Sequence, residues 1–539
     1  MSKFILPTKI ITENNVINSL NLFKEKEKQI HLNEREVTTL SKGSFIVLDF
    51  GKEIAGGIRI LTKDATNKCA KIHIRFGESV GECYAPIGYK NATNDHSTRD
   101  LYYDIPFLSD ITIGSTGFRF VRIDVEDDVT LSFKNIYAVV DEVKQIDGYF
   151  ISDDELLNKI FDIAAYTNAL CHKNGFYYDG IKRDRLVWIG DAYPIYKASK
   201  YLYLKDEELL NSLKFATIES PLPNWVNWSP MYSFWWMLLL AEHYLDNNDM
   251  NVVLPLLDYL KGIIYQSKDL IKENGDLSFG FLFIDWPSHY DIEDPLGNDA
   301  IKKKDEITGC RFLVLLTLKK VLKAFEKLLN NEDLKLINEL ISRLEKGNSN
   351  VIKFKQIAAL GVEAGYKDKN KEDILFNNGA NGLSTFQSYF ILKSISELGM
   401  HEESVAQAKE YYGKMIELGA TTFFEDFDIA WADNVTKIDE IPVEGKKDFH
   451  GDHGTFCYKG YRHSLCHGWS SGVVAFIFEY IVGVKQIDST NFIIKPNLGN
   501  IKNLKCAFAT KNGLVKLEFV NGKLINKEVP EGILISTEE

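Results

Sequence analysis

Several features that would assign this 539-residue chain to other classes of protein are missing from its sequence. No apolar run approaches the roughly 18 residues that a membrane-spanning helix requires. The densest basic run, Lys302 to Lys304, is short and is followed by two acidic residues, and the net charge is −13. A protein that binds nucleic acid needs a clustered basic face. We therefore expect neither a membrane nor a nucleic acid as partner.

Paired cysteines and a targeting segment are missing too. The seven cysteines are an odd number, are widely spread and form no C-x-x-C pair, which does not fit a disulfide framework. The N-terminal stretch MSKFILPTKIITENN lacks the basic segment and long apolar run of a secretory signal. Both absences predict a cytoplasmic protein with reduced thiols.

What is present is the composition of a globular protein, with 45% hydrophobic and 26% charged residues and length for two to four domains. From residue 41 to 140, short alternating runs such as SFIVLDFG and GFRFVRIDVED are separated by turn residues, which is typical of an antiparallel β-sandwich. Similar runs return after residue 484. We predict an N-terminal β-sandwich domain (1–148), a helical domain (149–485) and a short C-terminal β domain (486–539).

Between the β segments, apolar residues recur at the helical period. About a dozen helices joined by loops is the number that six helical hairpins provide. We therefore expect an (α/α)6 toroid whose inner helices are apolar and whose loops gather at one end. The predicted helices cover residues 153–172, 191–204, 206–218, 231–246, 250–271, 308–329, 332–346, 351–360, 384–398, 402–418 and 465–484.

All eight tryptophans lie in the predicted helical domain. Three fall in predicted helices, where core packing is the expected role: Trp235, Trp236 and Trp469. Others fall in predicted loops: Trp225, Trp228, Trp286 and Trp431. Flat ring faces beside polar neighbours suit a cavity wall for a ligand with apolar faces and a hydroxylated rim.

The stretch YYDGIKRDRLVWIGD, residues 177–191, joins two predicted helices and carries three carboxylates: Asp179, Asp184 and Asp191. Asp191 is placed to cap the following helix. Asp184 lies between two arginines, so membership of a solvated ion cluster is the alternative to a functional role. Considered singly, these residues need no catalytic role.

A second acid changes this interpretation. Glu425 follows two phenylalanines in TTFFEDF, and desolvation by such neighbours raises a carboxyl pKa, which is one route to a general base. An exposed loop acid is the alternative. Two acids on different toroid loops, with tryptophans around them, form the layout that glycoside hydrolysis requires.

The stretch DGIKRDRLVWIGDA resembles the signature of bacterial α-L-rhamnosidases of glycoside hydrolase family 78, approximately D-C-P-x-R-E-R-x-G-W-x-G-D. The two agree in register at Asp179, Arg183, Arg185, Trp188, Gly190 and Asp191. Further segments resemble the family in order: SFIVLDFGKEIAGGIRI, FIDWP, TTFFEDF, SLCHGWSSGVVAFIFEYIVGV and NFIIKPNLG. The resemblance covers most of residues 45–520.

This resemblance implies an (α/α)6 catalytic toroid with β-domains that hydrolyses terminal α-L-rhamnosides with inversion of the anomeric centre. By matched position, Glu425 would be the general base and Asp184 the general acid. The residues that would bind or orient the sugar are Asp179, Arg183, Trp188, Asp191, Asp285, Trp286 and His467. The implied partner is a small glycoside or oligosaccharide, with no metal or other cofactor, and a homo-oligomer stays open.

The sequence departs from the family at three places. Asp184 stands where the usual acid is glutamate, which shortens its reach by roughly 1.5 Å. Val187 replaces a glycine, and Gly180-Ile181 replaces Cys-Pro. A related glycosidase with another sugar or leaving-group specificity therefore stays open, as does a catalytically inactive sugar-binding toroid.

A zinc-dependent hydrolase is the alternative from another class. The stretch DFHGDHGTFCYKGYRHSLCH holds four of the eleven histidines. His463 and His467 are four apart, a spacing that on a helix places two imidazoles on one face for zinc, but no glutamate follows His463 as H-E-x-x-H demands. We favour a loop that covers the pocket. His467 then either contacts sugar or is a buried histidine bonded to a backbone carbonyl.

Overall fold

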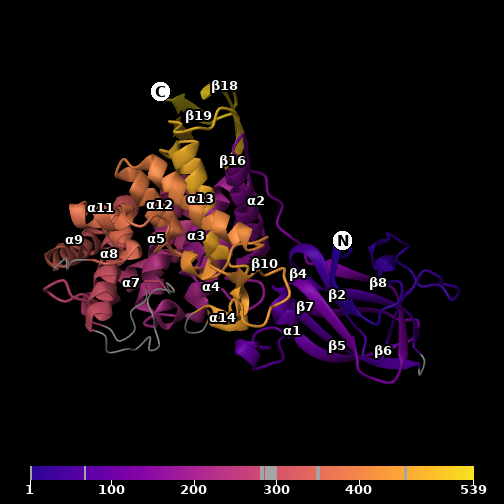
Figure 1. Ribbon diagram of the computed structural model, residues 1–539. Helices are drawn as coiled ribbons and strands as arrows, with labels where there is room; N and C mark the ends of the chain where they lie inside the picture. The colour runs from indigo at the N-terminus through magenta and orange to yellow at the C-terminus, as the bar shows by residue number, and fades with distance from the viewer. Residues whose placement is uncertain are drawn as a thin grey trace.

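The computed structural model describes residues 3–65, 68–278, 284–285, 300–347, 352–454 and 458–538. These residues form an N-terminal β-domain, a central body of helices and a C-terminal β segment (Figure 1). The predicted fold class, an (α/α)6 domain flanked by β-sandwich-type domains, is confirmed. None of the helices within these ranges is long and apolar enough to cross a membrane.

The N-terminal domain is organised by one long strand, β4 (Phe45–Ala65). Its two halves pair with β2 and β8 on one side, whereas β7 pairs with both halves on the other. The register shifts near Gly56, which bends the strand around a core of alternating aliphatic residues. The other strands are β1 (Lys3–Ile5), β2 (Lys9–Asn14), β3 (Thr38–Ser41), β5 (Cys69–Gly77), β6 (Asp100–Pro106), β7 (Asp110–Val125) and β8 (Thr130–Val140), with the short helix α1 (Val80–Tyr84) after β5.

The helices alternate between an outer and an inner layer. The inner helices are α3 (Ala192–Leu202), α5 (Pro230–Asn247), α8 (Ala300–Phe325), α10 (Lys355–Glu363), α12 (Ser388–Glu397) and the run η8 (Gly468–Gly472), α15 (Val473–Phe476) and η9 (Ile477–Ile481). Each packs against the next and α15 returns to α3, so the layer closes on itself. The outer helices are α2 (Glu155–Leu170), α4 (Glu207–Glu219), α7 (Leu257–Leu270), α9 (Asn331–Lys346), the shorter α11 (Lys369–Phe376) and α13 (His401–Glu417).

The sequence pattern explains which helices lie inside. In α5, the run from Phe234 to Ala241 is fully buried, including Trp235 and Trp236 as predicted, because a helix that is apolar all round must be covered on every side. The predicted helices each overlap an observed one, but α11 was missed. Its sequence KNKEDILF buries only Lys371 and Leu375, so it carries little apolar periodicity.

One charged residue from each inner helix forms what we call the charged ring: Lys197, Glu242, Lys320, Glu363, Lys393 and Glu479 in chain order. The charges alternate in sign. Lys197 Nζ lies 3.4 Å from Glu242 and 3.0 Å from Glu479. Lys320 Nζ lies 2.8 Å from Glu242, and Lys393 Nζ lies 2.5 Å from Glu363. Lys197 lies at the middle of α3 and the other five lie in the C-terminal half of their helices, so the opposite, N-terminal ends are left for the loops.

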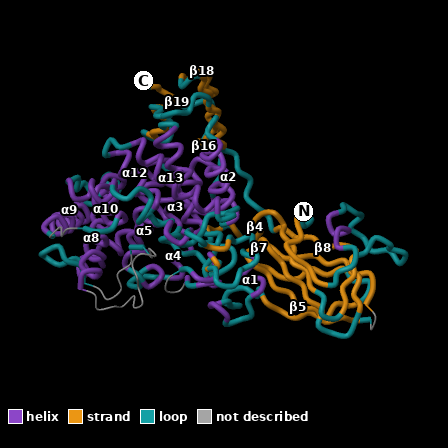
Figure 2. Tube along the Cα trace, viewed as in Figure 1, coloured by secondary structure: helices purple, strands orange, loops and turns teal. Residues whose placement is uncertain are grey.

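The C-terminal β segment rests on the helical body, as the strands beside the helices in Figure 2 show. One sheet contains β16 (Leu504–Thr510), β17 (Gly513–Val520) and β18 (Lys523–Glu528), and β9 (Tyr149–Ser152) pairs with β16. The other contains β14 (Val484–Gln486), β15 (Asn491–Ile494) and β19 (Leu534–Thr537). Phe508 packs against Phe478 of η9. Residues 149–152 are thus part of the C-terminal sheet.

Candidate active site

Three loop segments, residues 178–181, 423–426 and 463–468, meet at the N-terminal ends of the inner helices. Gly468 N–H donates to Asp179 C=O (2.7 Å), and His467 N–H donates to Phe423 C=O (3.0 Å). Glu425 N–H donates to Ser464 C=O (3.0 Å). These bonds fix the backbone on which the proposed base and several proposed sugar-binding residues stand.

Asp179, Asp191 and His467 form a compact buried cluster, with a ligand atom of each within 4.8 Å of the others. Burial raises the pKa of Asp179 and of Asp191 well above the ordinary value, and the Asp184 and Asp179 charges respectively add to it. Burial and the Arg183 charge lower the pKa of His467. Carboxyl and imidazole groups can together donate and accept hydrogen bonds, as recognition of hydroxyl groups requires. The same atoms are also of a type that can hold a cation.

The prediction that Asp191 caps its helix is wrong in one respect. Asp191 occupies the cap position of α3, but its side chain makes no capping bond. Its Oδ1 instead accepts from Tyr232 Oη (3.3 Å), and its Oδ2 lies 3.8 Å from His467 Nε2. The carboxyl therefore points toward the cluster and away from the helix backbone.

Asp184 lies at the rim of the site. Its backbone has a φ of +56° and that of Arg185 a φ of +54°, in the left-handed region that non-glycine residues rarely adopt. Such strain persists where surrounding contacts hold it, which is common at functional sites. The Asp184 side chain is 17% exposed and lies 2.9 Å from Arg183 Nη1, so it is not the fully solvated ion cluster considered from the sequence.

Arg183 joins the two proposed catalytic carboxylates. Its Nη1 contacts Asp184 and its Nη2 pairs with Glu425, and the guanidinium lies over the Tyr458 ring at 4.9 Å. Glu425 is 1% exposed, and its Oε2 accepts from Ser464 N–H at 3.0 Å. Of the two alternatives considered from the sequence, an exposed loop acid and an acid desolvated by its phenylalanine neighbours, the structure shows the second.

The electrostatics of Glu425 follow from this burial. Burial raises the pKa of Glu425 above its ordinary 4.5, because it outweighs the opposing effects of the Arg183 charge and the Ser464 N–H. His467 Nε2 lies 3.5 Å from Glu425 Oε1. Trp469, expected only as core filler, also donates from Nε1 to the Glu425 backbone carbonyl (2.8 Å).

Aromatic residues lie beside the acidic stretch. Trp188 packs against Trp228 (ring centroids 6.4 Å apart) and Tyr232 (5.9 Å). Trp228 itself is 85% exposed. Asp285 is buried and accepts from Ser384 Oγ. Trp286, predicted as a pocket wall, lies outside the described residues.

Several residues that sequence analysis missed support the catalytic loops. Glu78, in the loop before α1, accepts from Leu465 N–H (2.6 Å) and Ser464 Oγ (3.2 Å). Lys182 Nζ lies 3.0 Å from Glu78 and donates to His463 C=O at 2.5 Å. Burial raises the pKa of Glu78 to about 7 against the charge of Lys182. Lys182 belongs to KRDR within the acidic stretch, so the sequence offered a signal for it. Nothing in the sequence linked Glu78 to the site.

The histidine spacing does not build the zinc-binding helix face that was considered as an alternative. His463 ends the short helix η7 (Gly460–Arg462), and His467 precedes η8, so the two are not on one helix. His463 Nε2 accepts from Asp426 N–H (2.9 Å) and is occupied. The His467 ring lies between Glu425 and Asp191, not on a backbone carbonyl.

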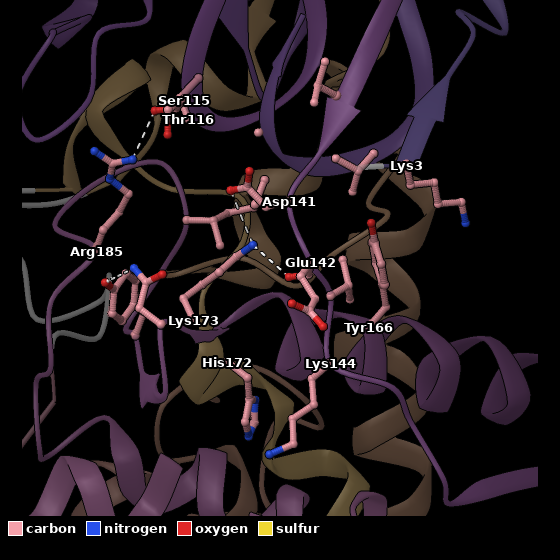
Figure 3. Close-up of a pocket in the computed structure, with 18 of the residues that line it drawn as sticks. Lys3, Ser115, Thr116, Asp141, Glu142, Lys144, Tyr166, His172, Lys173 and Arg185 are labelled. Carbon is pink, nitrogen blue, oxygen red and sulfur yellow. Dashed lines mark hydrogen bonds and ion pairs between the residues drawn. The ribbon is translucent and has the colours of Figure 1, made fainter. Parts of the chain in front are cut away.

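A cavity of about 1350 Å³ lies on the other side of the acidic stretch, between the N-terminal domain and the helical body (Figure 3). Tyr178, Ile181 and Arg185 face it, whereas Asp179, Arg183 and Glu425 are not in its wall. Arg185 points across it to Ser115, whose carbonyl its Nη1 contacts at 3.1 Å (Figure 3). This cavity is therefore distinct from the candidate active site.

Comparison with known proteins places this fold. No protein-family model and no curated protein sequence matches the chain. The architecture is that of the α-L-rhamnosidases of glycoside hydrolase family 78, as the sequence resemblance implied.

Three solved structures illustrate the likeness. A family 78 rhamnosidase of Bacillus sp. GL1 has a TM-score of 0.71 at 19% identity over 94% of this chain. A rhamnosidase from Klebsiella oxytoca with rhamnose bound gives 0.66 at 17% over 89%, and an Aspergillus terreus α-L-rhamnosidase 0.69 at 15% over 98%. The chain spans 55%, 96% and 61% of these proteins. At such identities the likeness establishes the fold.

Proposed function

We propose that this chain is an inverting glycoside hydrolase that releases terminal α-L-rhamnose from small glycosides or oligosaccharides. The observation that carries the proposal is the pair Asp184 and Glu425, which lie on two different loops and are both contacted by the single guanidinium of Arg183. Inverting enzymes need two carboxyl groups roughly 6.5–9.5 Å apart, with room for a water between the base and the sugar. The likeness to solved α-L-rhamnosidase structures motivates rhamnose as the sugar.

In the proposed reaction, Glu425 removes a proton from a water molecule as the water attacks the anomeric carbon. The bond from that carbon to the glycosidic oxygen breaks, and this oxygen takes a proton from the Asp184 side of the site. Asp179, Asp191 and His467 hold the sugar hydroxyls. Arg183 moves from the Asp184–Glu425 bridge to the sugar. The products are β-L-rhamnose and the free alcohol.

The test is hydrolysis of p-nitrophenyl α-L-rhamnopyranoside, followed by proton NMR of the first anomer released. First release of β-L-rhamnose supports both sugar and stereochemistry. First release of the α-anomer contradicts inversion. If this and other α-L-rhamnosides stay intact while another glycoside is cleaved, the sugar assignment is wrong. If no glycoside is cleaved but rhamnose binds, the protein is a sugar-binding toroid.

The acid-side limb of the kcat/KM pH profile should lie above pH 4.5. The base must be ionised, and the pKa of Glu425 is raised above 4.5 by burial, so activity should fall as pH drops through that higher value. Because the Asp184 charge also raises this pKa, Asp184→Asn should move the limb to lower pH. Profiles of both proteins on the aryl glycoside check this. A limb at or below 4.5 would contradict it.

Asp184→Asn should also discriminate between leaving groups. The alcohol of an alkyl rhamnoside is a poor leaving group unless its oxygen is protonated. For this substrate we therefore expect a loss of roughly 10²-fold or more in kcat. p-Nitrophenolate needs little protonation, so the aryl substrate should lose much less. Equal losses on the two substrates would argue that Asp184 takes no part in proton donation.

A further inference from the structure

We infer that His96 of the N-terminal β-domain is the partner that supplies the proton for the leaving group, acting together with Asp184. This inference rests on the proposed function and adds a residue from another domain to it. His96 Nε2 lies 3.1 Å from Asp184 Oδ1. The contact joins the loop before β6 to the acidic stretch before α3, and no sequence motif connects the two.

Two nitrogen-bearing side chains meet at one oxygen of Asp184. Arg183 Nη1 lies 2.9 Å and His96 Nε2 lies 3.1 Å from Oδ1. A guanidinium keeps its protons in proteins, whereas an imidazole can carry a proton and release it. His96 is therefore the group at this oxygen that can deliver a proton.

His96 is held in place by both domains. Arg185 Nη2 donates to the His96 carbonyl (2.6 Å), while its Nη1 donates to Ser115 C=O. Ser97 Oγ donates to the same Ser115 carbonyl (2.9 Å). On the far side of the loop, Asp95 pairs with Arg462 Nε at 2.8 Å. Asp184 is the charged group in contact with the imidazole, and the charged groups of the segments around it are Asp95, Arg183, Arg185 and Arg462.

Exposure and reach fit this role. The His96 side chain is 33% exposed and that of Asp184 is 17%, so both lie at the rim of the candidate site, where solvent can return a proton to the imidazole. Asp184 is one methylene shorter than glutamate, which costs roughly 1.5 Å of reach. An imidazole beside the carboxylate supplies a donor atom on that side.

In the proposed step, the transferable proton starts on His96 Nε2, beside Asp184 Oδ1. As the bond from the anomeric carbon breaks, this proton goes to the glycosidic oxygen and leaves a neutral imidazole. The attacking water gives its proton to Glu425. Release of that proton to solvent and uptake of one by His96 restore the starting state.

The test is His96→Asn, with His96→Ala as a second variant and His31→Asn as the matched control. Asparagine tolerates the left-handed backbone of His96 (φ +61°) but cannot carry the proton. His31 is an exposed histidine of the same domain. We expect kcat on an alkyl α-L-rhamnoside to fall about 10- to 100-fold, with a change below about 3-fold on the aryl substrate.

Two further measurements separate proton supply from a merely structural role. The alkaline limb of the pH profile on the alkyl substrate should disappear in His96→Asn, and added imidazole should restore part of the activity of His96→Ala. If the wild type is active, Glu425→Gln is inactive and His96→Asn matches His31→Asn on both substrates, the His96 inference is overturned and the proposed function stands. If the wild type hydrolyses no α-L-rhamnoside, the proposed function fails.

Discussion

Glu425→Gln should lower kcat about 100- to 10,000-fold, the usual contribution of a general base, while the protein stays folded. Glutamine keeps the shape of the side chain and an oxygen for the Ser464 N–H, but it cannot take a proton from water. Steady-state rates on p-nitrophenyl α-L-rhamnopyranoside measure the loss, and thermal unfolding of the variant verifies the fold.

The control for this variant is Glu417→Gln. Glu417 lies at the end of α13, shortly before Glu425 in the chain, but its side chain is 69% exposed and pairs with Lys414 at 2.9 Å. The Glu417→Gln variant should retain full activity. Near-wild-type turnover by Glu425→Gln would show that another group activates the water, and the assignment of the base would have to be withdrawn.

Lys197→Met should destabilise the helical domain by about 3–5 kcal/mol, because it leaves two buried carboxylates of the charged ring without their shared partner. Lys197 is 6% exposed, and Glu242 and Glu479 lie on either side of its ammonium group. All eight tryptophans lie in the helical part of the chain, so their fluorescence during denaturant unfolding reports on this domain.

Lys516→Met is the matched control, because it breaks the exposed strand pair of Lys516 and Glu528 and should have little effect. Equal midpoints for the two variants would contradict the importance of the charged ring.

The charged ring also predicts an acid dependence. Burial alone would raise the pKa of Glu479, but Lys197 and Lys200 outweigh it and lower the pKa from 4.5 to about 2. A carboxyl with a lower pKa in the folded state stabilises the fold above pH 4.5 and loses this contribution as pH falls toward 2. The wild type should therefore lose stability over this window, and Lys197→Met should lose less.

Most of the fold could be predicted from local patterns in the sequence. Helical periodicity located the inner and outer helices, because an apolar stripe needs only residues three and four apart to be recognised. It failed at α11, where tertiary packing stabilises a polar stretch. The family signature likewise brought Asp179, Asp184 and Asp191 into one hypothesis, and the phenylalanines beside Glu425 predicted its burial.

The direction of individual side chains could not be predicted from local patterns. Asp191 occupies a cap position by sequence, yet its carboxyl faces Tyr232 and His467 because those groups offer partners from other elements. His463 and His467 have helical spacing but lie on no common helix.

The sequence by itself determined the elements, their order and the chemical types available to the site, because these depend on residues close together in the chain. Only the tertiary structure decided that Arg183 bridges Asp184 and Glu425, that Glu78 supports the loop behind Glu425, and that His96 lies against Asp184. The six alternating charges of the inner helices also become one ring only when the helices close on themselves. Apart from the contact of Arg183 with its neighbour Asp184, these contacts join residues tens to hundreds of positions apart, and their geometry is set by how whole domains pack.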